Sequence, residues 1–333
     1  MDDILSENTI LVTGVTGLLG GAVARALLQE GCRVRAMARI PERAGSLADL
    51  GAEIVEADLA DLPSLERAVS DCQVVFHFAA ALAGDFVSRD YFHQVNVDGT
   101  LQLAKAALSG GVKCFLHAST AWVYGYTAAP GTTESSPYRI SHDLYIDTKI
   151  EAERRLQQLC QENGLPLVII QPSEVYGPGD RTWTLGPIHY LKAGRLLLVD
   201  QGSGVIQPIY VADVVRGTLA AARRGRAGEA YLLCGPEVVT LKRYYAELAR
   251  MVGSKQPSSI PWWLAVPVVS LAEGWSALVH RPPLFSRTML RSNTMRASYD
   301  GSKAQTELGF IPQVSLEAGM AEVAAWLDSP VRR

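Results

Sequence analysis

Near its N-terminus the chain reads Thr9-Ile10-Leu11-Val12-Thr13-Gly14-Val15-Thr16-Gly17-Leu18-Leu19-Gly20. An apolar stretch of strand character leads directly into three glycines, and Ala22–Glu30 then shows the periodicity of an amphipathic helix. Glycines allow a tight turn and let backbone approach a pyrophosphate, while the start of a helix offers free N–H groups to phosphate. A glycine-rich turn between a core strand and a helix has the same outline, but in this position we interpret the pattern as a dinucleotide-binding turn. Its contacts are expected at Gly14, Gly17, Leu18 and Gly20.

The order of elements favours a doubly wound parallel sheet of the α/β class. Predicted strands alternate with predicted helices, and such alternation places helices on both faces of the sheet. We expect strands at Thr9–Thr13, Arg33–Ala38, Glu53–Glu56, Val74–Phe78, Cys114–Ala118 and Pro166–Gln171, and helices at Gly20–Glu30, Pro63–Ser70, Val97–Leu108 and Ile150–Asn163. Ligands of such sheets bind outside the carboxyl ends of the strands, so the loops that follow the strands are expected to hold the chemistry.

A second motif, Tyr145-Ile146-Asp147-Thr148-Lys149, places a phenol and an ammonium four residues apart, ahead of the helix-favouring run Ile150–Leu159. One helical turn directs both side chains the same way. A free tyrosine has a pKa of about 10, and a nearby cation lowers that pKa by stabilising the phenolate. Such a phenol is suited to protonate a carbonyl oxygen, or to deprotonate an alcohol, while hydride moves at the carbon. Taken alone the spacing also fits an exposed helical pair, but the glycine turn in the same chain favours catalysis.

The composition is that of an ordinary globular protein. The 333 residues are 48% hydrophobic and 20% charged with a formal net charge of -3, and no Lys/Arg-rich run points to nucleic acid. The five cysteines are far apart and form no metal or redox pair, so we expect free thiols in a cytoplasmic protein without a metal site. The acidic start does not resemble a signal peptide. No stretch reaches the length of a confident membrane span; the nearest, Ile260–Val279, contains Glu273 and two prolines.

Together with further motifs, these residues resemble the extended short-chain dehydrogenase/reductase family over nearly the whole chain. The C-terminal region is most similar to the 3β-hydroxysteroid dehydrogenase-like branch and its bacterial ketone-reductase relatives. The matching segments are Thr13–Gly20, Asp58-Leu59, His77-Phe78-Ala79-Ala80, Asn96–Thr100, Ser119–Gly125, Tyr145–Lys149, Val175–Pro178, Tyr210–Asp213, Tyr299–Ala304 and Glu307–Phe310. The resemblance implies a Rossmann domain over residues 1–172, to which residues 204–235 return, and a smaller, mostly helical substrate lobe formed by residues 173–203 and 236–333.

The resemblance implies catalytic roles for three residues. Tyr145 would be the general acid/base, and Lys149 would bind the nicotinamide ribose and lower the tyrosine pKa. Thr120 matches the family's catalytic Ser/Thr, which hydrogen-bonds the substrate oxygen. Its neighbour Ser119 should point the other way on an extended strand end, so it ranks second. Without the resemblance, Thr120 would be interpreted as a polar residue that caps a turn.

Further cofactor contacts are implied at the ends of the strands. Asp58 matches a family residue that bonds the adenine amino group, although an Asp there is also an ordinary helix cap. Ala79 and Ala80 look like small residues against which the cofactor lies. His77 is expected to pack in the core, and Asn96 to hold backbone together. The same resemblance places Leu59, Tyr145, Lys149, Pro172 and Val175 in the cofactor site.

The end of the second predicted strand favours NADP(H) over NAD(H). The segment Arg35–Arg39 contains no acidic residue that would bond the adenosine ribose and repel a 2'-phosphate. Arg39 is similar in position to the arginine of NADP-dependent reductases in the family, and a guanidinium binds phosphate through two donors. The alternative is an exposed arginine among several, and some relatives with this pattern accept NAD, so NAD(H) stays open.

Departures from the family pattern argue against sugar substrates. Where the family's dehydratases follow the catalytic Thr with an Asp-Glu pair, this chain has Ala121-Trp122. Ile206 stands where nucleotide-sugar epimerases often carry an arginine for the diphosphate, and Glu174 stands where they tend to carry Asn. Gln171 replaces a common arginine. Because an isoleucine does not bind a diphosphate and a carboxylate repels one, a nucleotide sugar is an improbable substrate.

Apolar residues fill the expected substrate lobe instead. The candidate substrate contacts are Trp122, Glu174, Trp183, Ile206 and Tyr210, with Trp262, Trp263 and Trp275 in the same lobe. These tryptophans are expected either to line an apolar pocket closed by a mobile lid or to form the core of the lobe itself. The run Ile260–Val279 also suggests peripheral contact with a membrane that supplies an apolar substrate.

The leading hypothesis is an NADP(H)-dependent oxidoreductase that interconverts a ketone and a secondary alcohol on a largely apolar small molecule, of steroid, polyketide or terpenoid type. The first alternative is a sugar epimerase, in which the hydride leaves and returns to the opposite face while NAD(P) is retained. The second is a non-catalytic NADP-binding protein, whose expected mark would be a broken Tyr/Lys pair. A homodimer through the helices over Val97–Leu108 and Tyr145–Asn163 is implied by the resemblance only.

Overall fold

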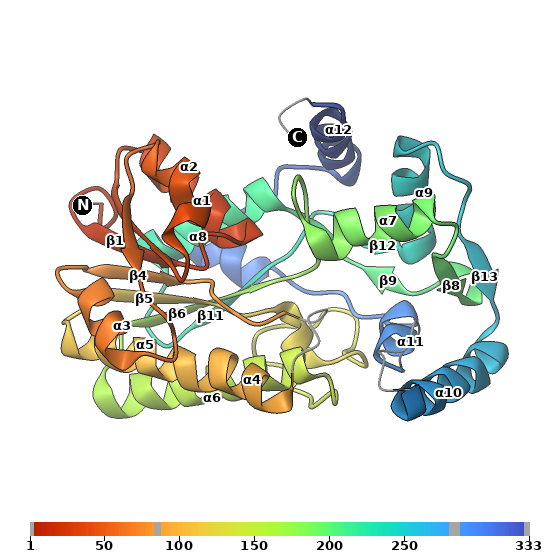
Figure 1. Ribbon diagram of the computed structural model, residues 1–333, viewed down its shortest axis with the longest axis horizontal. Coiled ribbons are helices and arrows are strands. Elements are labelled where there is room, and N and C mark those ends of the chain that lie inside the picture. The colour runs from red at the N-terminus through yellow and green to blue at the C-terminus, as the bar shows by residue number, and fades with distance from the viewer. Residues whose placement is uncertain (1–2, 83–87, 280–286, 330–333) are drawn as a thin grey trace.

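A single parallel sheet of seven strands forms the centre of the molecule, in the order β11-β6-β5-β4-β1-β2-β3 (Figure 1). The computed structural model describes residues 3–82, 88–279 and 287–329, with side chains described outside residues 273–289. The strands of the sheet are β1 (Thr9–Thr13), β2 (Arg33–Ala38), β3 (Glu53–Glu56), β4 (Val74–His77), β5 (Cys114–Ala118), β6 (Leu167–Pro172) and β11 (Ala230–Leu233). The chain runs outward in opposite directions from β1 and β4, so the prediction of a doubly wound sheet is confirmed.

Helices cover both faces of this sheet (Figure 1). The helices are α1 (Leu18–Gln29), α2 (Gly45–Ala48), α3 (Leu62–Val69), α4 (Arg89–His93), α5 (Thr100–Ser109), α6 (Leu144–Asn163) and α8 (Val211–Arg224). Alternation along β1 shows why two layers form: Ile10 and Val12 pack in the core beneath α1 and α8, while Leu11 packs beneath α3 and α5. All three side chains are 0% exposed, as expected for a strand buried on both faces.

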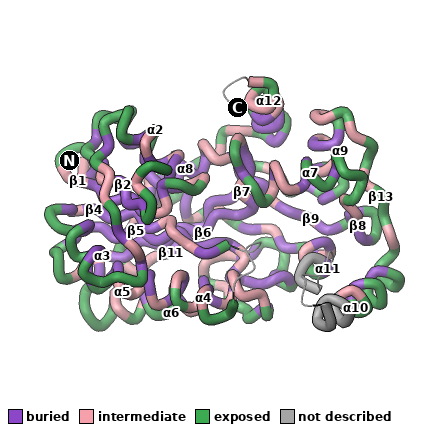
Figure 2. The backbone as a smooth tube through the Cα atoms, in the orientation of Figure 1, coloured by how far each residue is buried: buried purple, intermediate pink, exposed green. Residues whose placement is uncertain are grey.

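A second, smaller lobe lies beyond the carboxyl ends of the strands, on the right in Figure 1. Its core contains Tyr176, Tyr244 and Met320, which come from segments far apart in the sequence. Figure 2 shows buried residues along the strands of both lobes and exposed residues on the outer helices. The elements are β7 (Val175–Tyr176), α7 (Gly186–Lys192), β8 (Leu197–Val199), β9 (Val205–Ile206), β10 (Ile209–Tyr210), β12 (Val239–Thr240), α9 (Leu241–Met251), β13 (Ser258–Ile260), α10 (Trp262–Val279), α11 (Arg287–Asn293) and α12 (Leu316–Asp328). Short helical turns complete the chain: η1 (Pro41–Ala44), η2 (Gln94–Gly99), η3 (Ala121–Tyr124), η4 (Arg181–Leu185), η5 (Asp200–Gly202) and η6 (Ala304–Leu308).

The largest difference between expected and observed helix boundaries is at the start of α6, where a capping residue sets the first turn. Helix α6 begins at Leu144 instead of Ile150, because the side chain of Asp143 accepts hydrogen bonds from the first backbone N–H groups. The helix expected over Val97–Leu108 is split into η2, a wider helical turn, and α5. Within the described ranges, no helix combines the length and apolar character that crossing a membrane requires.

Candidate active site

The glycine turn lies at the point where the order of the sheet reverses, between β1 and β4. Gly14 has a φ of +68°, and a Cβ there would lie 2.7 Å from the backbone nitrogen of Ala79 and 2.7 Å from the carbonyl carbon of Phe78. A Cβ at Gly20 would collide with the carbonyl oxygen of Gly14. These contacts are backbone against backbone, so only glycine satisfies both the turn and its packing.

The start of α1 faces this turn with its donors free of side-chain caps. Gly17 is the N-cap residue, has no side chain to accept from the first N–H groups, and itself donates to the Gly14 carbonyl at 2.9 Å. An uncapped helix N-terminus above a glycine turn is a fitting site for the pyrophosphate of a dinucleotide. Leu18 is the first helical residue, and Ala79 and Ala80 are half-buried beside the turn.

The remaining cofactor candidates lie on both sides of the turn. Arg39, directly after β2, is exposed and contacts the hydroxyl of Tyr91 at 3.5 Å. Asp58, after β3, accepts from the backbone N–H of Ala60 at 2.9 Å, so it forms a local turn while its neighbour Leu59 is buried. The N-cap position of helix α3 is held by Asp61, whose side chain makes no capping hydrogen bond. On the β6 side of the sheet, Pro172 is buried and Val175 is half-buried.

Two residues expected to be structural are confirmed as such. The ring of His77 is 1% exposed, with Nδ1 2.9 Å from the hydroxyl of Thr13 and Nε2 2.8 Å from that of Thr100. The side-chain amide of Asn96 accepts from the backbone N–H of Ala81 at 2.7 Å and donates to its carbonyl at 3.1 Å. Asn96 thus holds the segment after β4 in place, His77 joins β4 to β1 and α5, and the side-chain donors of both residues are used within the protein.

The catalytic candidates Tyr145 and Lys149 lie on successive turns of α6. The start of this helix is fixed by Asp143, whose Oδ1 accepts from the backbone N–H of Tyr145 at 2.9 Å and from that of Ile146 at 3.1 Å. Sequence reasoning missed this cap, although an Asp directly before an apolar-periodic run is a recognisable signal for one.

Lys149 is buried against the end of β5. Its side chain is 3% exposed, and Nζ donates to the carbonyl of Ala118 at 2.6 Å and lies 3.1 Å from Nε2 of His117. Burial lowers the pKa of Lys149 to about 8. His117, which sequence reasoning did not identify, is buried as well, and burial together with the charge of Lys149 lowers its pKa, so the ring is a neutral acceptor.

The expected lowering of the Tyr145 pKa is wrong for this state of the protein. Burial raises the pKa of the phenol, and the carboxylates of Asp143 and Glu153 raise it further. Lys149 does not offset this, since its ammonium is directed toward Ala118 and His117. Tyr145 therefore remains a protonated phenol at neutral pH, although part of its ring is exposed.

Thr120 follows β5 and lies beside the same helix. Its Oγ1 accepts from the backbone N–H of Trp122 at 3.3 Å and caps η3, which packs against α6. Because that contact uses the oxygen as an acceptor, the hydroxyl proton remains free to be donated to a ligand. Ser119, directly after β5, is buried.

The substrate candidates form two groups. Trp122 contacts both Glu174 and Trp183, whereas Ile206 and Tyr210 lie in the core of the small lobe. The indole N–H of Trp122 donates to Oε1 of Glu174 at 2.8 Å, and Oε2 of Glu174 accepts from the backbone N–H of Gln207 at 2.9 Å. The Trp122 ring meets that of Trp183 edge to face, with centroids 5.8 Å apart. Trp122, Trp183 and Tyr145 are all partly exposed on the same hydrophobic cluster.

Ile206 and Tyr210 lie in the core of the small lobe instead of on an open surface. Ile206 is 0% exposed, because it belongs to β9 and pairs with Val239 of β12. The Tyr210 ring packs edge to face on Tyr176. Trp262 and Trp263 are exposed on α10, and the side chain of Trp275 lies outside the described residues.

Comparison with known proteins gives consistent matches. Residues 10–234 match the family described as "NAD dependent epimerase/dehydratase family". The chain is 31% identical to the 4-hydroxy-2-methyl-3-oxo-4-farnesyl-3,4-dihydroquinoline-1-oxide ketoreductase of Stigmatella aurantiaca, over 93% of each chain. It is 30% identical to the 2-alkyl-3-oxoalkanoate reductase of Stenotrophomonas maltophilia, over 95% of this chain and 98% of the relative. Steroid dehydrogenases are among the further relatives.

Solved structures give the same result. The UDP-glucose 4-epimerase of Thermotoga maritima, determined with UDP-glucose, superposes with a TM-score of 0.78 at 25% identity, over 96% of this chain and 98% of the epimerase. The family match covers more than half of the chain and includes the glycine turn, Thr120, Tyr145 and Lys149. The chain therefore belongs to the NAD-dependent epimerase/dehydratase family, the extended short-chain dehydrogenases/reductases.

Proposed function

We propose that this protein is an NADP(H)-dependent oxidoreductase that interconverts a ketone and a secondary alcohol on a largely apolar substrate. The observation that carries the proposal is the combination of the Tyr145–Lys149 pair with an aromatic wall. Trp122, two residues after Thr120, and Trp183 are partly exposed on the cluster that also holds Tyr145. Carbonyl chemistry and apolar recognition thus fall in one region.

The residues have complementary roles in this proposal. The nicotinamide of bound NADP(H) supplies the hydride for reduction or accepts it in oxidation. Tyr145, a neutral phenol at neutral pH, gives its proton to the carbonyl oxygen as negative charge develops there. Thr120 donates its free hydroxyl proton to the same oxygen. Lys149 supplies positive charge close to both residues, since it is anchored on Ala118.

The preference for NADP(H) rests on the residue after β2. Arg39 is exposed, the hydrogen bond that its guanidinium makes to a described residue is a long one of 3.5 Å to the Tyr91 hydroxyl, and it follows a strand without acidic residues. A free guanidinium at this edge suits a 2'-phosphate, whereas a carboxylate would repel it. The relatives support the substrate class, because two of them are named for reductions of farnesyl- and alkyl-substituted ketones.

The proposal is tested with purified protein and a panel of steroid, terpenoid and long-chain β-keto substrates. Loss of NADPH absorbance should match formation of the alcohol one to one. The same panel with NADH should give lower kcat/KM. If no ketone of the panel is reduced while the protein binds NADP(H) tightly, the assignment as a ketone reductase fails.

A sugar epimerase is the second candidate, because the epimerase of Thermotoga maritima is similar over nearly the whole chain. In this chain Ile206 is 0% exposed and the carboxyl of Glu174 is enclosed by Trp122 and Gln207, so neither offers a cation to a diphosphate. Interconversion of UDP-glucose and UDP-galactose without net consumption of added cofactor would favour the epimerase.

Two partner assignments remain proposals. We propose a homodimer through α5 and α6, which light scattering of the purified protein tests. We also propose peripheral membrane contact through α10, where Trp263 is 73% and Leu271 is 75% exposed. Large exposed apolar side chains on one helix are typical of a surface that lies against lipid.

A further inference from the structure

A buried carboxyl that the proposed reaction does not use lies directly behind the catalytic pair. Glu153 is on α6, one turn beyond Lys149 and two turns beyond Tyr145, and its side chain is 0% exposed. Its Oε2 accepts from the hydroxyl of Tyr138 at 2.6 Å and from Nε2 of Gln171 at 2.9 Å. Burying a carboxylate is costly unless neighbouring groups compensate, so these neighbours determine whether the group is charged.

The donors to Glu153 are neutral. Burial raises the pKa of Glu153, while the hydroxyl of Tyr138 and the amide of Gln171 oppose that rise. Gln171 carries no charge, and its Oε1 accepts from the hydroxyl of Tyr124 at 2.7 Å. Of the described residues that act on Glu153, Lys149 is the one cation. Glu153 and Lys149, which are both buried and one helical turn apart, therefore depend on each other for charge compensation.

Other titratable groups around the pair do not supply charge near neutral pH. His77 on β4 and His117 on β5 face Lys149, and burial together with the Lys149 charge lowers the pKa of both rings, that of His77 to about 3. Burial raises the pKa of the phenols of Tyr124 and Tyr138, from the segment after β5, and of Tyr145 on α6. Both histidines and all three phenols are thus neutral, which leaves the carboxyl of Glu153, buried one helical turn from Lys149, as the acidic group whose charge would oppose loss of the Lys149 proton.

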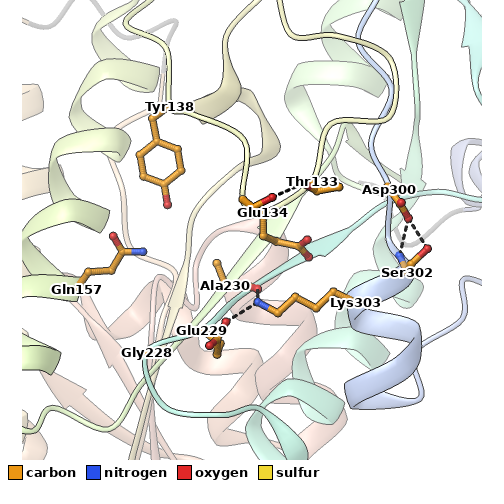
Figure 3. A pocket seen from close by; sticks show the side chains of 11 residues that line it. Thr133, Glu134, Tyr138, Gln157, Gly228, Glu229, Ala230, Asp300, Ser302 and Lys303 are labelled. Atoms are coloured by element: carbon orange, nitrogen blue, oxygen red, sulfur yellow. Dashed lines mark hydrogen bonds and ion pairs between the residues drawn. The ribbon is translucent and has the colours of Figure 1, made fainter.

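Tyr138 links this buried group to the far side of the molecule. Its ring lines a cavity of about 420 Å³ together with Gln157, Glu134 and Lys303 (Figure 3). Residues 228–230, at the amino end of β11, form another wall, so this wall lies at the opposite end of the strands from the glycine turn. The donor from Tyr138 therefore reaches Glu153 from the side of this cavity.

We propose that Glu153 is a positioning residue whose buried carboxylate keeps Lys149 in its cationic form beside Tyr145. The effect of Glu153 on turnover rests on the proposed function. Its effect on the charge of Lys149 does not, because that charge is measurable without substrate. Without that charge the Lys149 side chain loses a charge-assisted hydrogen bond to Ala118 and no longer favours negative charge on the Tyr145 oxygen.

The first experiment measures Lys149 directly. The chain has seven lysines, so lysine labelled with ¹³C at Cε gives few NMR signals, and Lys149→Arg assigns the one of interest. In Glu153→Gln the Lys149 pKa should fall by about one unit, because a nearby negative charge is removed without loss of side-chain volume. Glu153→Asp should restore most of the wild-type value. An unchanged Lys149 pKa in folded Glu153→Gln would overturn the proposal.

The second experiment measures the pH profile of kcat for ketone reduction. Activity requires cationic Lys149, so it should fall as pH rises through the Lys149 pKa, and Glu153→Gln should move that decline to lower pH by about one unit. Tyr124→Phe is the control. It removes the hydroxyl that donates to Gln171, which in turn donates to Glu153, and it should not change the pH at which activity declines. A purely structural Glu153 would lower kcat at every pH without moving the profile.

Tyr138→Phe provides a second route if Glu153→Gln does not fold. It removes one donor from the carboxylate, so the pKa of Glu153 rises and that of Lys149 falls, by less than in Glu153→Gln. No change in the Lys149 titration of this variant would also count against the proposal. If the titration shifts as expected but no ketone is reduced, the proposed function fails while the inference about Glu153 stands.

Discussion

The indole N–H of Trp122 donates a hydrogen bond of 2.8 Å to Oε1 of Glu174, 52 residues further along the chain. This bond joins η3, which follows the proposed catalytic residue Thr120, to the loop that connects β6 and β7. It also accounts for the carboxylate that the sequence places at an apolar site: Glu174 holds the aromatic wall instead of facing a substrate diphosphate.

Trp122→Phe should therefore destabilise the fold in a pH-dependent way. Burial raises the pKa of Glu174, and the Trp122 donor lowers it. A carboxyl whose pKa is higher in the folded than in the unfolded chain favours folding below the unfolded pKa and loses that contribution as pH rises through the folded pKa. Removing the donor raises the folded pKa further, so the loss in free energy of unfolding should reach about 1–3 kcal/mol near pH 7 and shrink toward pH 4.5. Urea unfolding over this range measures it, with Trp183→Phe as a control whose loss should not vary with pH.

Tyr145→Phe should abolish most turnover and leave cofactor binding intact. Only the proton donor is removed, while the ring keeps its place on the small-lobe cluster. We expect kcat to fall by at least about 100-fold, with the Kd for NADPH, measured by fluorescence titration, unchanged. Tyr124→Phe removes a buried hydroxyl from the same region and should keep kcat within about threefold of wild type. A near-normal rate in Tyr145→Phe would refute the assigned role.

Arg39→Asp should reverse the coenzyme preference. The exposed guanidinium would be replaced by a carboxylate that repels a 2'-phosphate and accepts from ribose hydroxyls. We expect the ratio of kcat/KM with NADPH to that with NADH to fall by about 100-fold, which corresponds to roughly 3 kcal/mol. Arg43→Asp makes the same charge change at an exposed position four residues later and should leave the ratio within about twofold. Equal ratios in both variants would show that Arg39 does not bind the phosphate.

Gly14→Ala should lower the free energy of unfolding by more than the strained backbone angle alone explains. The φ of +68° strains any L residue, and the added Cβ would also lie 2.7 Å from the Ala79 nitrogen. Gly31→Ala is a matched control, because Gly31 has a φ of +79° and nothing within 4 Å of an added Cβ. We expect the control to lose about 1 kcal/mol of unfolding free energy, and Gly14→Ala to lose more and to bind NADPH at least about tenfold more weakly. Comparable losses in the two variants would contradict the steric account.

Membrane contact through α10 is tested with vesicles of phosphatidylcholine and phosphatidylglycerol. Trp263→Glu and Leu271→Glu each place a charge on the exposed apolar surface of the helix and should reduce co-sedimentation several-fold. Ile311→Glu changes an equally apolar residue, 57% exposed, outside this helix and should not. Wild-type protein that stays in the supernatant would exclude the contact.

The sequence was sufficient for features that depend on neighbouring residues. Apolar runs with polar or glycine residues at their ends predicted β1, β5 and the glycine turn. The structure has β1 and β5 at the expected bounds. The cap at Asp143 is also a local feature, and overlooking it placed the start of α6 six residues too late.

Features that depend on distant residues could not be obtained in this way. The partners of Lys149 come from β5, and those of Glu153 come from β6 and the Tyr138 segment. The spacing of Tyr145 and Lys149 shows that they share a helix face, but it does not show toward which strand the ammonium turns. For the same reason, the burial of Ile206 depends on its pairing with Val239, which lies in a different part of the lobe.

The contacts of Gly14 and the exposure of Arg39 make the two ends of the proposed coenzyme site unequal in their tolerance of substitution. At the inner end, backbone atoms pack directly against Gly14 and Gly20, so neither position has room for a side chain. The outer rim carries the solvent-facing guanidinium of Arg39, which lies 3.5 Å from the Tyr91 hydroxyl. Redesign of coenzyme choice in this scaffold therefore has room only at the rim, and it leaves the chemistry at the centre of the sheet untouched.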